Sequence, residues 1–167
     1  MTILTSRKSR GPGPLRSLHQ RGVAAVELAV LLTPLVLMIF GATELGRAIY
    51  TFNVLDKTVR DAARHLSQNT PGDIKIAAQA TCLTVYGNTD CSGTAVAAGL
   101  TTSMVKICDS TVTTCSNYAN QLTHYDSTSS INLVSVTITG YPFTSLVKFV
   151  IPNLTFNPIS VTMRGQS

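Results

Sequence analysis

The chain has 167 residues, enough for one small domain and a membrane anchor. Hydrophobic residues make up 44 % of it and aromatic residues 6 %, with no Trp, so its core must be built mainly from aliphatic side chains and alanine. The net charge is +5, yet five of the 13 basic residues lie before Gly22, and from Val23 onward eight basic residues balance eight acidic ones. Because the body of the chain has no basic excess, we expect no nucleic-acid binding.

Residues 1–22 combine alternating Gly and Pro with the five basic residues, and they contain nothing that can pack, so they predict a disordered cytoplasmic leader. Residues 23–43 follow as a transmembrane helix with a single charge, Glu27, because 21 helical residues cross a bilayer core of about 30 Å. Pro34 predicts a kink, which membrane helices tolerate. The positive charge before the span predicts a cytoplasmic N-terminus and a translocated C-terminal part.

Residues 44–66 predict an amphipathic continuation of the same helix, because apolar residues recur there at spacings of three and four. On the opposite face, charged residues such as Asp56 and Arg60 stand four apart, a spacing that allows them to pair. We expect one helix from about Val23 to Leu66. The apolar stripe consists of Leu45, Ala48, Ile49, Phe52, Leu55, Val59, Ala62, Ala63 and Leu66.

Residues 67–167 predict an exported α+β domain. A second helix is expected over 73–86, capped by Asp73, with a strand over 81–86 as the alternative. Strands are expected over 104–107, 131–139 and 157–164, a polar loop over 110–130, and an apolar turn or one short helix over 143–151. Helices followed by strands indicate a small antiparallel sheet of about three strands, and the apolar stripe would cover it.

Four cysteines, Cys82, Cys91, Cys108 and Cys115, lie in the exported part, and their even number predicts two disulfides. Three pairings are possible. We favour Cys82–Cys91 and Cys108–Cys115, because each pair brackets a short turn rich in Gly, Asn or Thr. Free buried thiols are the alternative, whereas the cysteine spacings do not fit a zinc site.

A basic leader ends in Gly22, an apolar helix begins at Val23, and Glu27 is the fifth residue after the glycine. Together with the sequences at 44–47 and 62–64, this pattern resembles the TadE-like pseudopilins of the Tad (tight adherence) pilus system, within the type IV pilin superfamily. The resemblance is close over 21–66 and loose over 130–164. Val23 departs from it, since ordinary pilins usually have Phe or Met there.

This resemblance implies a pilin-like fold, with the long helix packed on the sheet, and cleavage between Gly22 and Val23 by a membrane-embedded prepilin peptidase. It also implies other pilins or pseudopilins and an inner-membrane assembly platform as partners, besides the lipid bilayer. The expected location is the inner membrane, in one pass, with the C-terminal domain periplasmic or extracellular and the chain possibly in the pilus fibre. The expected role is assembly, adherence or secretion.

Elementary electrostatics gives Glu27 a role in subunit pairing. Cleavage after Gly22 creates an α-amino group on Val23 that is positively charged near pH 7. The Glu27 carboxylate of one chain can meet this amine on its neighbour in a setting of low dielectric, and an unpaired charge there is costly, which favours one axial register. The alternative is an interfacial glutamate near the headgroups without a partner.

The sequence carries no P-loop, no catalytic Cys/His spacing and no zinc-protease motif, so we expect no enzyme, no cofactor and no metal. His124 and Asp126 lie in a polar loop, and His65 ends the amphipathic helix, so we interpret all three as structural or surface residues. Two other functions stay open. One is a membrane-anchored binding module that is not cut at Gly22; the other is a secreted protein, which the poor signal-peptidase site at 40–42 disfavours.

Overall fold

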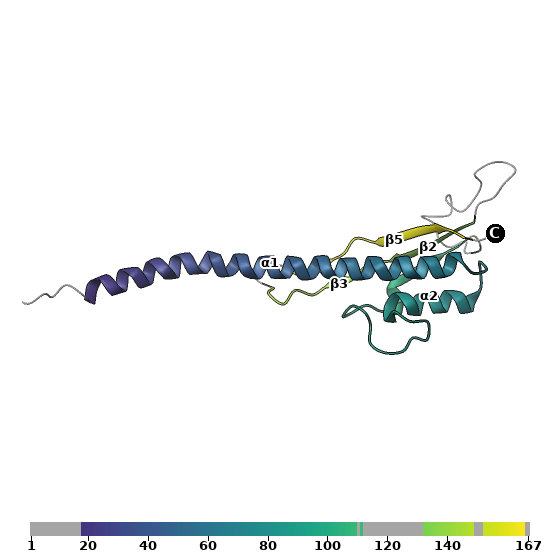
Figure 1. Cartoon of the computed structure of the whole chain (residues 1–167), viewed down its shortest axis with the longest axis horizontal. Coiled ribbons are helices and arrows are strands. Elements are labelled where there is room, and N and C mark those ends of the chain that lie inside the picture. The colour runs from purple at the N-terminus through teal and green to yellow at the C-terminus, as the bar shows by residue number, and fades with distance from the viewer. Residues whose placement is uncertain (1–17, 110, 112–131, 149–151, 166–167) are drawn as a thin grey trace, which may run out of the picture. The chain divides into compact units, whose positions relative to one another are not determined.

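A computed structural model describes residues 18–109, 111, 132–148 and 152–165 of the chain. They fall into two compact units, Met1–Phe40 and Gly41–Ser167. The second unit combines the C-terminal part of a long helix with a shorter helix and two small antiparallel sheets (Figure 1). The chain is therefore α+β, as its sequence predicts.

The long helix α1 spans Leu18–Ser67 and passes through Pro34 without interruption. It begins before Gly22, so the last residues of the predicted leader are helical rather than disordered. The physical reason is that residues 18–21 are tolerable helix formers, and extending an existing helix is far easier than nucleating one. Within α1, the Thr33 hydroxyl donates to the carbonyl oxygen of Ala29 at 3.0 Å. A kink at Pro34 stays a prediction.

Helix α2 spans Ile74–Tyr86, so the alternative of a strand over 81–86 is wrong. The Asp73 side chain caps it by accepting from the backbone N–H of Lys75 at 2.8 Å. At its other end Gly87 has a φ of 74°, and its N–H donates to the carbonyl oxygen of Leu83 at 3.0 Å. Such a left-handed residue suits glycine and ends the helix.

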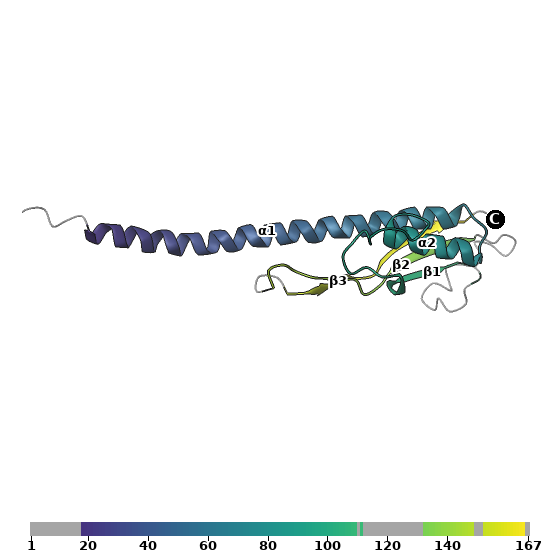
Figure 2. The same ribbon diagram turned by 90° about the horizontal axis from the view of Figure 1, so that it is seen from below.

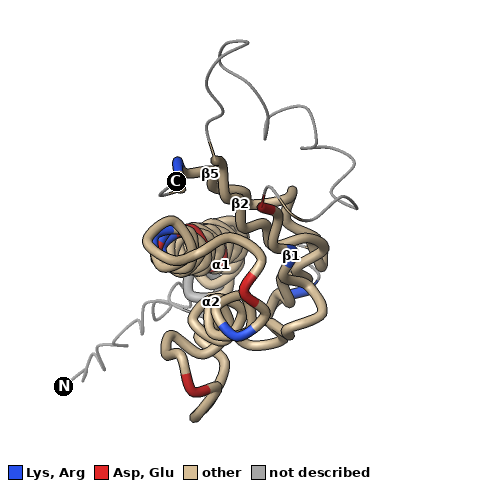
Figure 3. The backbone as a smooth tube through the Cα atoms, turned by 90° about the vertical axis from the view of Figure 1, so that its right-hand side faces the viewer, with Lys and Arg blue, Asp and Glu red and all other residues tan. Residues whose placement is uncertain are grey.

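The three-stranded sheet confirms the predicted antiparallel arrangement. A short 3-10 turn, Thr102–Met104, leads into β1 (Val105–Cys108), which pairs with β2 (Leu133–Ile138). Strand β2 pairs on its other side with β5 (Ile159–Arg164), so the order is β1-β2-β5. Figure 3 shows α1 and α2 on the same side of this sheet. Buried aliphatic side chains of α1, α2 and β2 form the core between them, among them Leu55, Val85 and Val136.

A second sheet was not expected from the sequence. Strands β3 (Pro142–Phe143) and β4 (Leu154–Thr155) form a short antiparallel hairpin that flanks the apolar turn or short helix predicted over 143–151. Residues 144–148 are not helical, so within the described residues the turn is the correct alternative. Figures 1 and 2 show the described parts of this hairpin running beside α1, away from the three-stranded sheet. The Phe143 ring stacks on the Phe156 ring with centroids 5.7 Å apart, which favours an extended chain over a helical turn.

The apolar stripe of α1 is covered only in its second half. Its members from Leu55 onward are buried, as predicted. Leu45, Ile49 and Phe52, however, are 58 %, 53 % and 44 % exposed, so the expectation that the whole stripe covers the sheet is wrong. Helical periodicity shows which face is apolar, whereas the length of the facing sheet decides how much of that face is buried.

Candidate assembly and anchoring site

The predicted processing site lies within α1. Gly22 and Glu27 are both exposed, and Glu27 forms no hydrogen bond or ion pair with any described residue. A Cβ atom built on Gly22 would meet no atom within 4 Å, so the position is sterically open. Glycine is less favourable in a helix than alanine by about 0.8–1 kcal/mol, so Gly22 weakens α1 at this position.

Among the described residues, one helix is long and apolar enough to cross a membrane, and none of its most apolar window is buried. A continuous apolar surface of this size marks contact with lipid or with other proteins. By length and composition, this helix could span a membrane. The exposed large apolar side chains of its first part are Val23, Val26, Leu28, Val30, Leu31, Leu32, Leu35, Val36, Leu37, Met38, Ile39 and Phe40.

Directly after this apolar stretch, Glu44 is only 3 % exposed. Its Oε2 atom accepts from Nη2 of Arg47 at 3.0 Å and from the backbone N–H of Leu146 at 3.4 Å. The hydrogen bond from Arg47 lowers the pKa of Glu44, against the opposing effect of burial, and the Ser145 side chain adds to the lowering. The carboxylate therefore stays ionised and holds the loop after β3 against α1.

Arg47 also connects α1 to β3 and the loop that follows it. Its Nη2 atom also donates to the carbonyl oxygen of Thr144, and its guanidinium lies 4.4 Å from the centroid of the Phe143 ring. From the sequence, residues 44–47 stood out only as part of the family resemblance, and this contact was not predicted. Opposite charges three apart on a helix were the available signal, but nothing in the sequence pointed to a partner near residue 144.

A groove of about 420 Å³ lies beside this cluster, between α1, the loop after α2 and β3. Its walls are largely apolar, with the Tyr141 hydroxyl donating to the carbonyl oxygen of Ala98 at 2.9 Å. The groove is lined by Arg47, Tyr50, Thr51, Val54, Val96, Ala97, Ala98, Gly99, Tyr141, Pro142, Phe143 and Thr144. Such a lining suits binding of an apolar or aromatic group.

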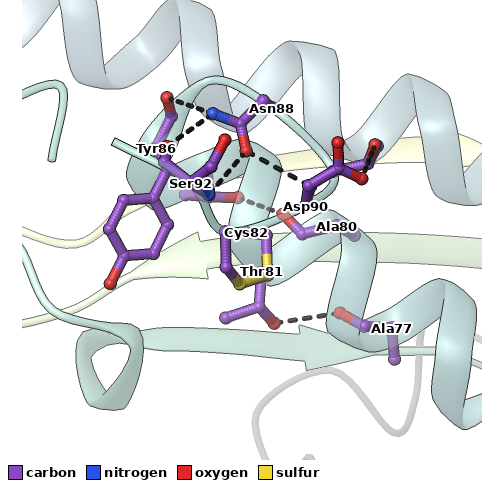
Figure 4. Close-up of a disulfide and its surroundings, with 11 residues drawn as sticks. Ala77, Ala80, Thr81, Cys82, Tyr86, Asn88, Asp90 and Ser92 are labelled. Atoms are coloured by element: carbon purple, nitrogen blue, oxygen red, sulfur yellow. Dashed lines mark hydrogen bonds between the residues drawn. A yellow bond between two sulfur atoms is a disulfide. The ribbon is translucent and has the colours of Figure 1, made fainter. Parts of the chain in front are cut away.

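One of the two predicted disulfides, Cys82–Cys91, is present in the structure, with Cα atoms 4.7 Å apart. Figure 4 shows Asn88 beside it, bridging the turn: its Nδ2 donates to the Ser92 carbonyl at 2.7 Å and its Oδ1 accepts from the Ser92 N–H at 3.1 Å. These bonds close the turn that follows α2. The role of Asn88 was not predicted from the sequence, although asparagine side chains commonly form hydrogen bonds to the backbone in such turns.

The other residues discussed from the sequence are only partly described. Cys108 is disulfide-bonded, while Cys115, His124 and Asp126 lie outside the described residues. His65 lies at the end of α1, and its Nε2 is 3.3 Å from Oε1 of Gln79 on α2. Within the part of the chain that the structure describes, no group of three or more His, Cys, Asp or Glu side chains is placed to hold a metal ion.

Comparison with known families finds one similarity, and it lies in this helix. The model of the family described as TadE-like protein matches residues 22–64. Over this part of α1, the chain is similar to TadE-like proteins. The match begins at Gly22 and takes in Glu27, Glu44 and Arg47, and it ends shortly before α1 does. Neither the curated proteins nor the solved structures contain a match to the chain.

The TadE-like match suggests a role related to the Tad pilus and implies pilin-type partners in pilus assembly. It covers the apolar part of α1 and the Glu44–Arg47 pair, and it leaves α2 and both sheets outside. The match thus covers the apolar part of α1 and its continuation, whereas the disulfide loop and most of the groove lie beyond it.

Proposed function

We propose that this chain is a minor pseudopilin of a Tad-type pilus, anchored in the inner membrane with its N-terminus in the cytoplasm. A prepilin peptidase cuts it between Gly22 and Val23, and the processed chain joins other pilins on the assembly platform to serve adherence or secretion. The observation that carries this proposal is that the TadE-like match begins at Gly22, where a basic leader meets the apolar helix.

The exposure of Glu27 supports the pairing part of the proposal. A lone carboxylate in an apolar helix is costly, by roughly 2.5–3.5 kcal/mol at the bilayer centre and less near its edge. Glu27 has no partner among the described residues of its own chain, which leaves its carboxylate available to a neighbouring subunit. The new amine on Val23 of that subunit is the partner. The role is structural, and no catalytic step is part of it.

A second function, a membrane-anchored binding module that is not cut, is favoured by one observation. The groove beside Arg47 is large enough for a side chain or a small apolar group, and the Arg47 Nε atom is buried without a hydrogen-bond partner among the residues that the structure describes. In that case the chain would act by binding a partner in the groove, and Gly22 would not be a cleavage site.

Two glycine substitutions separate these functions. Gly22 and Gly46 both lie in α1, and a Cβ at either meets no atom within 4 Å, so Gly22→Ser and Gly46→Ser are matched in steric terms. We expect Gly22→Ser to abolish the size reduction that an active peptidase produces, and Gly46→Ser to leave it intact. Immunoblots of cells with and without the peptidase measure this. A mature band of normal size from Gly22→Ser would refute the cut site.

A further inference from the structure

The β3–β4 hairpin exposes apolar side chains next to the point where α1 leaves the predicted span. We propose that the described part of this hairpin, around Leu146, seats on the membrane surface, in the interfacial layer of the leaflet from which α1 emerges. The occupant of this surface is phospholipid. The proposal rests on the membrane anchoring proposed above and is independent of cleavage at Gly22.

The hairpin is fixed at the membrane end of the exported part. The backbone N–H of Leu146 donates to Glu44, and Arg47 donates to the carbonyl oxygen of Thr144. Glu44 directly follows residue 43, where the predicted span ends. The first fully buried core residue of α1 is Leu55, 11 residues beyond Glu44, which corresponds to about 16 Å along the helix at a rise of 1.5 Å per residue. The three-stranded sheet thus packs much farther along α1 than the hairpin does.

Bilayer dimensions place the contact points of the hairpin at headgroup level. The hydrocarbon core is about 30 Å thick and the whole bilayer about 40–45 Å, which leaves roughly 5–8 Å of headgroups on each side. The rise from Glu44 to Arg47 is about 5 Å, so both residues and the backbone they hold fall within this layer.

The composition of the hairpin suits this layer. Leu146 is 78 % exposed and Leu154 is 45 % exposed, and both lie outside the core. The sequence from 141 to 156 contains one basic residue, Lys148, and no acidic one. Lys148 is exposed, and Arg47 already neutralises Glu44, so the charge available to phosphates of the lipid is positive. Apolar side chains beside a lysine are typical of segments that lie in the interface plane.

The absence of Trp from the chain allows a direct test. Leu146→Trp introduces the sole tryptophan, and Ile74→Trp is its matched control, because Ile74 is also a highly exposed apolar residue, at 84 %, but lies at the start of α2. The full-length chains are reconstituted into vesicles of zwitterionic and anionic phospholipid, with and without brominated acyl chains. We expect the emission of Leu146→Trp to shift to shorter wavelength and to be lost on bromination, and that of Ile74→Trp to do neither.

Each outcome decides the proposal. Equal emission and equal quenching for the two variants in chains that float with the vesicles would overturn it and leave the anchor intact. A blue shift at position 146 that depends on protein density and not on bromination would show that a second copy covers the hairpin, which also overturns it. Chains that fail to float with the vesicles would overturn both the anchor and the seating of the hairpin.

Discussion

Glu27 and Glu44 lie on the same helix in contrasting environments. Glu44 is buried and bonded to Arg47, whereas Glu27 is exposed in an apolar stretch without a partner among the described residues of its chain. The first arrangement is complete within one chain. The second is not, which is why we assign Glu27 to contact between subunits and Glu44 to the structure of a single subunit.

At the residue scale, the proposal predicts that Glu27→Ala leaves the chain processed and in the membrane but lowers its incorporation into pili. The reason is that the amine of Val23 on the neighbouring subunit would then be buried without a partner, at a cost of about 3–5 kcal/mol. Quantitative immunoblots of sheared pili and of the membrane fraction measure both quantities. Unchanged piliation would count against the pairing.

At the scale of elements, much of the fold was predictable because its signals are local. Apolar spacing of three and four located α1, the Asp73 cap located the start of α2, and alternation located β2 and β5. The β3–β4 hairpin was not predictable in this way. Its strands have two residues each, and contacts from afar define them, such as Phe143 with Phe156 and Thr144 with Arg47.

The attachment of this hairpin to α1 should depend on pH. Glu44 lies outside the predicted span, and Arg47 lowers its pKa in the folded chain. A carboxylate with a lowered folded-state pKa stabilises the fold above its ordinary pKa, and this contribution is lost as the pH falls through the folded-state value. We therefore expect Glu44→Gln to lower the Tm of the C-terminal domain at neutral pH, and the difference from wild type to shrink toward zero in acid.

Thermal unfolding of the full chain in detergent, followed by near-ultraviolet circular dichroism at several pH values, measures this difference. Glu27→Gln is the matched control, because Glu27 lies on the same helix but makes no bond to the C-terminal domain. A Tm difference for Glu44→Gln that stays constant from neutral pH to below the ordinary carboxyl pKa would contradict the role given to the ionised side chain.

At the scale of the whole molecule, some functional features consist of residues that are close in the sequence, and others join segments that are far apart in it. The leader, Gly22, the span and Glu27 are neighbours in the sequence, so they could be recognised from the sequence alone, and the TadE-like match covers all but the leader. The groove and the Glu44–Arg47 cluster join α1 to residues near 98 and 144. Pairings over such separations leave no periodic signal, so only the structure reveals them.

The central claim is that one cleavage converts a membrane anchor into a subunit with a positive N-terminus and a carboxylate one turn below it. The most direct measurement is the N-terminal sequence of the protein extracted from cells in which the prepilin peptidase is active. The account predicts a chain that begins at Val23. A chain that still begins at Met1 under those conditions would contradict it.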